Sequence, residues 1–134
     1  MRLVRILILE DDNQTLALFL HKITKLELEL YEQVKNIEIA VTVLSEYTQV
    51  EKYVNQVNSD FFDAILLVRD CKAAGSFHAL DIEGFGPEKI ISISSMPQWN
   101  EDARKRGVSR VVFKDFERLS EFSDEVARQI KEIL

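Results

Sequence analysis

The segment Ala64–Val68 (AILLV) constrains the fold of this chain more than any other part of the sequence. Every residue in it is apolar, so both faces of the pleat are apolar as well. Strands that are buried on both faces are typical of parallel sheets, in which crossover connections cover the two faces with helices. The segment therefore predicts a central strand of a layered α/β sheet.

Strand-like and helix-like segments alternate along the rest of the chain. Branched apolar runs predict four more strands, over residues 3–9, 37–43, 90–93 and 108–113. Apolar residues at helical spacing predict helices over residues 13–33, 46–57, 76–82, 100–106 and 119–133. This order predicts an α/β fold of one domain over residues 1–134, with a doubly wound five-stranded parallel sheet and helices on both faces.

Composition and charge exclude several classes of protein. The net charge is −6, so the chain lacks the basic surface expected of a protein that binds nucleic acid or an anionic membrane. The single cysteine, Cys71, excludes a disulfide framework and a zinc site built from cysteines. The apolar run at residues 3–9 contains Arg5 and ends in acids, so it is too short and too charged for a signal peptide or a membrane span. We expect a soluble cytoplasmic protein.

Charged and hydroxyl side chains follow the predicted strands. The first strand is followed by Glu10 and Asp11, the third by Asp70, the fourth by Ser94 and the fifth by Lys114. Because the carboxyl ends of parallel strands meet along one edge of a sheet, these side chains should face a common crevice. Carboxylates that hold Mg²⁺, together with a hydroxyl and an ammonium group, suit the stabilisation of a phosphoryl group.

The segments "RILILEDDNQTLALFLHKI", "FDAILLV", "IISISS" and "ARKRGVSRVVFKDF" resemble the landmarks of the response-regulator receiver domain of two-component signalling. The resemblance covers nearly the whole chain and implies a flavodoxin-like fold with strand order 2-1-3-4-5. It implies that Glu10 and Asp11 hold Mg²⁺, and that Ser94 and Lys114 contact the phosphoryl group. It also implies a role in a phosphorelay, with a sensor histidine kinase or another signalling protein as partner and no enzymatic activity of its own.

Three positions depart from the family pattern. Val68 stands where the family carries its phosphoacceptor Asp, and Asp70 is the nearest acid and our candidate acceptor. Residues two apart in a strand are separated by about 6.5–7 Å, a shift that rotamers alone cannot absorb at a magnesium site. Asp115 replaces the proline that usually follows the family's Lys, and Val111 replaces a switching aromatic ring.

These departures leave two functions open. The chain is either a receiver that accepts a phosphoryl group on Asp70, or a degenerate receiver that binds proteins without phosphorylation. In the second case Trp99 and Val111 are candidates for the partner surface. A hydrolase of the haloacid dehalogenase type uses similar groups, but the sequence lacks the Asp-first pair that this class needs. The acids after the first strand also have a simpler explanation, as caps of the following helix.

Overall fold

The computed structural model describes residues 2–34, 36–70 and 77–134. Five parallel strands form one sheet in the order β2-β1-β3-β4-β5. The strands are β1 (Arg2–Leu9), β2 (Ile37–Leu44), β3 (Ala64–Val68), β4 (Ile90–Ser94) and β5 (Arg110–Phe113). The predicted α/β class, the parallel sheet and the flavodoxin-like strand order 2-1-3-4-5 are confirmed.

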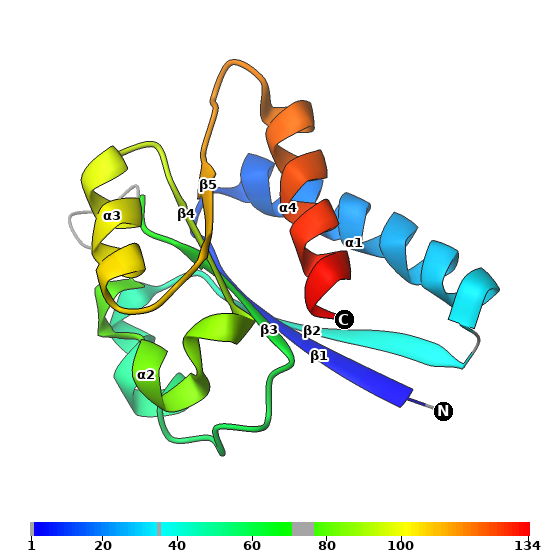
Figure 1. Ribbon diagram of the computed structural model, residues 1–134, viewed down its shortest axis with the longest axis horizontal. Coiled ribbons are helices and arrows are strands. Elements are labelled where there is room, and N and C mark those ends of the chain that lie inside the picture. Colours follow the sequence, from blue (N-terminus) through cyan, green and yellow to red (C-terminus); the bar gives the residue numbers. More distant parts are fainter. Residues whose placement is uncertain (1, 35, 71–76) are drawn as a thin grey trace.

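Helices cover the sheet unequally on its two faces. Figure 1 shows two long helices on one face and shorter elements on the other. The long helices are α1 (Asn13–Val34) and α4 (Leu119–Ile133). The other face carries α2 (Ile82–Phe85), α3 (Pro97–Lys105) and the helical turns η1 (Tyr47–Gln49), η2 (Val50–Val54), η3 (Phe77–Ala79) and η4 (Pro87–Lys89). In the described part of the chain, no helix is both long and apolar enough to cross a membrane.

Each face of the sheet has its own apolar core. The core under α1 and α4 contains Phe19 and Phe122, whose ring centroids lie 5.6 Å apart, together with Val68 of β3. The core on the opposite face includes Phe77 and Phe85. Every residue of β3 and of β4 is buried, as expected of strands that lie inside a parallel sheet.

The prediction of five strand–helix repeats is wrong for the connection between β2 and β3. A helix was expected over residues 46–57, and the chain instead forms the short turns η1 and η2. Val50 and Val54 are nevertheless buried against the sheet. The backbone N–H of Asn55 reaches the carbonyl of Val50, a five-residue π-type spacing. The apolar spacing therefore identified the buried positions, but a short π turn buries them as well as a long helix would.

Other boundaries differ by smaller amounts. The helix predicted over residues 76–82 lies partly outside the described residues, and the described part contains η3 and then α2. α3 begins at Pro97 rather than at residue 100, because proline is well suited to the first turn of a helix. Leu20 follows the helical spacing of the apolar residues in α1, but it is exposed on the side of the helix that points away from the core.

We expect the Phe122→Ala variant to lose about 3–5 kcal/mol of unfolding free energy, because the missing ring leaves a cavity beside Phe19. Urea unfolding followed by circular dichroism measures this loss. Phe116→Ala is the matched control, since that ring is 59% exposed and its removal should change stability by less than about 0.5 kcal/mol. Equal losses in the two variants would contradict the described core.

Candidate functional site at the carboxyl edge of the sheet

The strand order brings the predicted site residues to one edge of the sheet. We call this edge the carboxyl edge, because the parallel strands all end there. Glu10 follows β1, Asp70 follows β3 after one residue, Ser94 ends β4 and Lys114 follows β5. The backbone N–H of Lys114 donates to the carbonyl of Ser94 at 3.0 Å, so the ends of β4 and β5 remain paired at this point.

Glu10 and Lys114 form a buried ion pair. The Lys114 Nζ donates to Glu10 Oε1 at 2.9 Å, and the two residues are only 1% and 0% exposed. The second carboxylate oxygen, Glu10 Oε2, accepts the backbone N–H groups of Asp11 at 3.0 Å and Asp12 at 3.3 Å. Burial raises the pKa of the Glu10 carboxyl above its ordinary value, and Lys114 and the two N–H groups oppose that rise.

Asp12 caps the first turn of α1. Its Oδ2 accepts the backbone N–H of Thr15 at 3.1 Å and the Thr15 hydroxyl at 2.6 Å. These bonds satisfy one of the free N–H groups at the start of the helix. Two of the three acids after β1 thus have separate structural tasks, since Glu10 pairs with Lys114 and Asp12 caps the helix.

Asp70 is bound to the end of β4. Its Oδ1 accepts the hydroxyl of Ser94 at 2.6 Å, and its Oδ2 accepts the backbone N–H of Ser95 at 2.7 Å. The Ser94 oxygen in turn accepts the backbone N–H of Met96 at 2.9 Å. The structure therefore brings Asp70 and Ser94 together as one pair, and Glu10 and Lys114 together as another.

Val68, the position at which the sequence resemblance places the phosphoacceptor of a receiver, ends β3. Its side chain is fully buried and belongs to the core under α1 and α4. It pairs with Ile93 of β4 in a regular register, and β3 is regular up to its last residue. No bulge inside the strand therefore shifts Asp70 back into the position of Val68.

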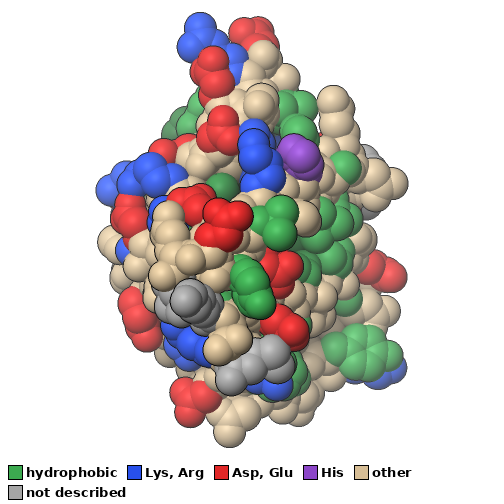
Figure 2. Space-filling view, turned by 90° about the vertical axis from the view of Figure 1, so that its right-hand side faces the viewer, with side chains coloured by type: hydrophobic (Ala, Val, Ile, Leu, Met, Phe, Trp, Pro, Cys, Tyr) green, Lys and Arg blue, Asp and Glu red, His purple; other side chains and the backbone are tan. Residues whose placement is uncertain are grey.

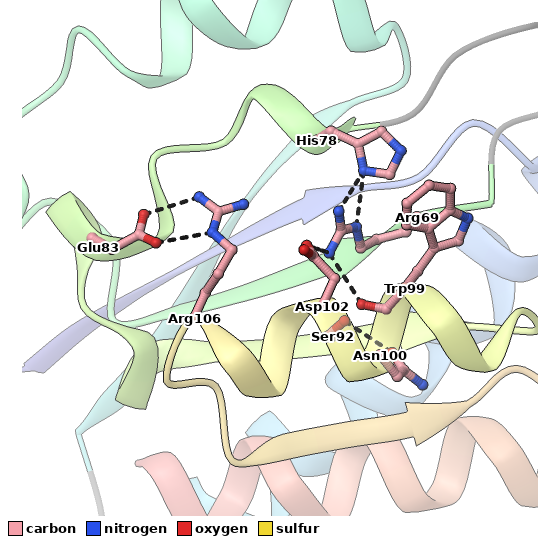
Figure 3. A network of polar contacts seen from close by, with 8 residues as sticks. All are labelled: Arg69, His78, Glu83, Ser92, Trp99, Asn100, Asp102 and Arg106. Carbon is pink, nitrogen blue, oxygen red and sulfur yellow. Dashed lines mark hydrogen bonds and ion pairs between the residues drawn. The ribbon is translucent and has the colours of Figure 1, made fainter.

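Arg69 organises a polar cluster that the sequence alone did not reveal (Figure 3). Its guanidinium is 3% exposed and donates from Nη1 to Asp102 Oδ2 at 2.9 Å and to the Trp99 carbonyl at 3.1 Å. Its Nε donates to His78 Nδ1 at 3.1 Å. Burial, followed by the charge of Arg69, lowers the pKa of His78, so this imidazole is neutral and serves as an acceptor. The sequence did contain a signal for this cluster. Arg69 directly follows a fully apolar strand, so its backbone lies in the buried part of the sheet and its side chain needs polar partners there.

Trp99 and Val111, the predicted partner surface, are both half-buried. The Trp99 ring packs against His78 with centroids 4.4 Å apart, and the Arg69 guanidinium carbon lies 5.3 Å from the ring centroid. Val111 packs against the core on the α3 face and also lines a surface hollow of about 350 Å³ with Phe113. Both residues have structural contacts, and their role toward a partner stays a prediction.

The carboxylate oxygens of Glu10 and Asp70 are not arranged as ligands of Mg²⁺. Mg²⁺ requires several oxygen ligands at close to 2.0–2.1 Å in octahedral geometry. Both oxygens of Glu10 are used by Lys114 and backbone N–H groups, and both oxygens of Asp70 are used at the end of β4. Within residues 2–34, 36–70 and 77–134, no three His, Cys, Asp or Glu side chains gather as a metal site.

Comparisons with known proteins show likeness only among solved structures. No protein-family model and no curated protein sequence matches the chain. Among solved structures, that of a bacteriophytochrome response regulator is similar, with 17% sequence identity and a TM-score of 0.49. The match covers 100% of this chain and 96% of the other. The flavodoxin-like fold stands on the strand order of the chain itself.

We expect Lys114→Met to destabilise the protein by about 3–5 kcal/mol at neutral pH, because it leaves the Glu10 carboxylate buried without its partner. The raised pKa of Glu10 fixes the sign of the pH dependence. The folded variant binds a proton more readily than the unfolded chain, so the loss should shrink as the pH falls toward the ordinary value of 4.5. Urea unfolding at two pH values measures this. The double variant Glu10→Gln/Lys114→Met should recover much of the loss, and a loss independent of pH would contradict the pair.

We expect Val68→Asp, which introduces the acid expected from the sequence resemblance, to cost about 3 kcal/mol or more, because the carboxylate enters an apolar core. Val68→Asn has the same shape without the charge and is the control. The difference between the two should diminish at low pH, where the buried Asp is protonated. Thermal unfolding with and without Mg²⁺ checks the interpretation. Stabilisation of the Asp variant alone by Mg²⁺ would place this side chain in a metal site rather than in the core.

Proposed function

We propose that this chain is a receiver-like signalling module that acts by binding a partner protein, without phosphoryl transfer to Asp70. The buried ion pair between Glu10 and Lys114 carries this proposal. In a working receiver, the resemblance implies that the Lys after the fifth strand is available to a phosphoryl group. Here its ammonium is 2% exposed and is bonded to a carboxylate.

The position of the acids supports the same proposal. A phosphoacceptor carboxylate must present an oxygen to a phosphodonor while cations neutralise the incoming charge. The Asp70 oxygens accept a hydroxyl and a backbone N–H from the end of β4, and Val68 is part of the apolar core. Neutral donors of this kind hold Asp70 in place without supplying the charge that a phosphoryl group needs.

The proposed partner is a sensor histidine kinase or another signalling protein in the cytoplasm. Trp99 and Val111 mark the proposed contact surface, and Val111 shares a surface hollow with the exposed ring of Phe113. The net charge of −6 supports a protein partner over nucleic acid or an anionic membrane. Regulation without catalysis suits a module in which Lys114 bonds to Glu10 and Asp70 bonds to Ser94.

Phosphoryl acceptance by Asp70 is the second candidate, and one observation favours it. Ser94, which corresponds to the family's phosphoryl-contacting hydroxyl, donates to Asp70 at 2.6 Å. Acceptance in this mode requires Lys114 to leave Glu10, and Glu10 and Asp11 to turn toward a shared Mg²⁺. The cost is that of exposing a buried charge pair, which is several kcal/mol.

Incubation with acetyl phosphate and Mg²⁺ separates the two candidates. We expect intact-protein mass spectrometry to show no added phosphoryl group, and nuclear magnetic resonance to show no site-specific shifts with beryllofluoride. A hydroxylamine-sensitive adduct that disappears in Asp70→Asn but persists in Asp115→Asn would instead establish the second candidate. Asp115 is the matched control because it adjoins Lys114 in sequence and is another acid beside the carboxyl edge.

A further inference from the structure

β2 is a long strand at the outer edge of the sheet, and one of its two sides is not paired with another strand of the described sheet. β2 is the first strand in the sheet order, so only β1 pairs with it. Its pairing runs from Ile37 to Leu44, which makes it twice as long as β5, the strand at the opposite edge. A long edge strand presents a row of backbone donors and acceptors that invites pairing with another chain.

The hydrogen bonds between β1 and β2 show which residues of β2 direct their backbone N–H and C=O groups away from the sheet. The N–H of Arg2 donates to the carbonyl of Asn36, and the N–H of Glu10 donates to the carbonyl of Leu44. In a parallel ladder this pattern directs the even-numbered residues of β2 toward β1. Ile39, Val41 and Val43 therefore direct their backbone groups away from the sheet. The N–H of Ile39 donates to the Glu27 carboxylate, which confirms the direction.

The outward-facing part of β2 is self-complementary. An antiparallel copy centred on Val41 would place Val41 opposite itself and Ile39 opposite Val43, so β-branched side chains would face each other. The same register pairs Ala40 with Thr42 and Glu38 with Leu44. No two like charges would then face each other within the strand pair.

A second apolar surface lies beside this edge on α1. Ala17, Leu20, Thr24, Leu28 and Tyr31 are spaced by three or four residues and form one helix face, which we call the outer stripe. All five residues are exposed, Leu28 at 63% and Tyr31 at 56%. Lys22 and Glu29, on the other side of α1, pair with Asp124 and Lys131 of α4. The outer stripe therefore points away from α4, past the edge of β2.

The strand edge and the outer stripe form one continuous surface. A hollow of about 380 Å³ runs between them, with Leu28 and Tyr31 of α1 on one side and Ile37 and Ile39 of β2 on the other. Figure 2 looks onto the end of the molecule where β1 begins and α1 ends, and it shows hydrophobic side chains gathered along one side of this face. Large exposed apolar patches on a folded domain mark sites of association.

We propose that this surface binds a second copy of the chain. β2 of each copy pairs antiparallel with its equivalent about a two-fold axis at Val41, which joins the two sheets into one. The same axis places the two α1 helices side by side and antiparallel, and Leu20 of one copy then lies level with Leu28 of the other. The Glu27 carboxylate leaves the N–H of Ile39, which bonds instead to the carbonyl of Val43 in the second copy. A two-fold symmetric contact of this kind is closed and cannot grow into a fibre through this edge.

Analytical ultracentrifugation over the micromolar range tests the proposal. We expect a reversible dimer, and Leu28→Lys should raise its dissociation constant about tenfold or more, because a charge enters the apolar contact. Gln33→Lys introduces the same side chain at an exposed position of α1 that is neither three nor four residues from any member of the outer stripe, and it should leave the dimer unchanged. A monomer at every concentration, or equal effects of the two variants, overturns the proposal.

Disulfide trapping tests the register. In a background in which Cys71 is replaced by Ser, the pair Ala40→Cys/Thr42→Cys should cross-link rapidly into a dimer. Facing residues at such positions lie about 4.5–5.5 Å apart, within the range that a disulfide spans. Each single cysteine variant should cross-link slowly, because neither residue faces its own copy. Equal rates for the single and double variants contradict pairing about Val41.

Removal of the Glu27 side chain distinguishes pairing of the β2 strands from a dimer that is held only by contacts between the α1 helices. Glu27→Ala frees the N–H of Ile39 for the second copy, so the dimer should become tighter by about tenfold. Circular dichroism verifies that the variant is folded. A dimer that is unchanged or weaker in this variant excludes strand pairing at Ile39.

Discussion

The ion pair between Glu10 and Lys114 is the contact on which the carboxyl edge of the sheet depends. It links residues that are 104 positions apart and ties the loop after β1 to the loop after β5. Two buried charges are tolerated only when they bond to each other and when their remaining polar atoms are satisfied. Glu10 meets this condition with the N–H groups of Asp11 and Asp12. The two loops are therefore fixed relative to each other, and the end of β4 is held between them through the carbonyl of Ser94.

A second buried cation fixes the neighbouring part of the same edge. Arg69 follows β3 and bonds to α3 through Asp102 and the Trp99 carbonyl, and to η3 through His78. Asp70, the next residue, bonds to Ser94. Adjacent residues of opposite charge thus anchor β3 to different elements. Because the oxygens of Glu10 and Asp70 bond to separate partners, each of these two carboxylates is held by its own closed set of contacts.

The sequence predicted the sheet well and the short connections poorly, for a physical reason. The apolar run Ala64–Val68 has to be buried on both faces, and few folds other than a parallel sheet provide this. Val50 and Val54 need only one buried side, which a short turn supplies as readily as a long helix. At the site, the topology was enough to bring Lys114 near the acids, but not to choose among them. Glu10 and Asp70 follow neighbouring strands, and only side-chain packing decides which of them receives the ammonium.

The carboxyl edge of the sheet and the outer strand β2 differ in which polar groups remain without a bonding partner inside the described part of the chain. At the carboxyl edge, Lys114 bonds to Glu10, and Asp70 bonds to the hydroxyl of Ser94. Along β2, the Glu27 carboxylate covers only the N–H of Ile39, and the strand continues past it through Val41 and Val43. A strand edge keeps its full row of bonding groups whatever its side chains are, because these groups belong to the backbone. The contacts at the carboxyl edge therefore leave the capacity of β2 to pair with another chain unchanged.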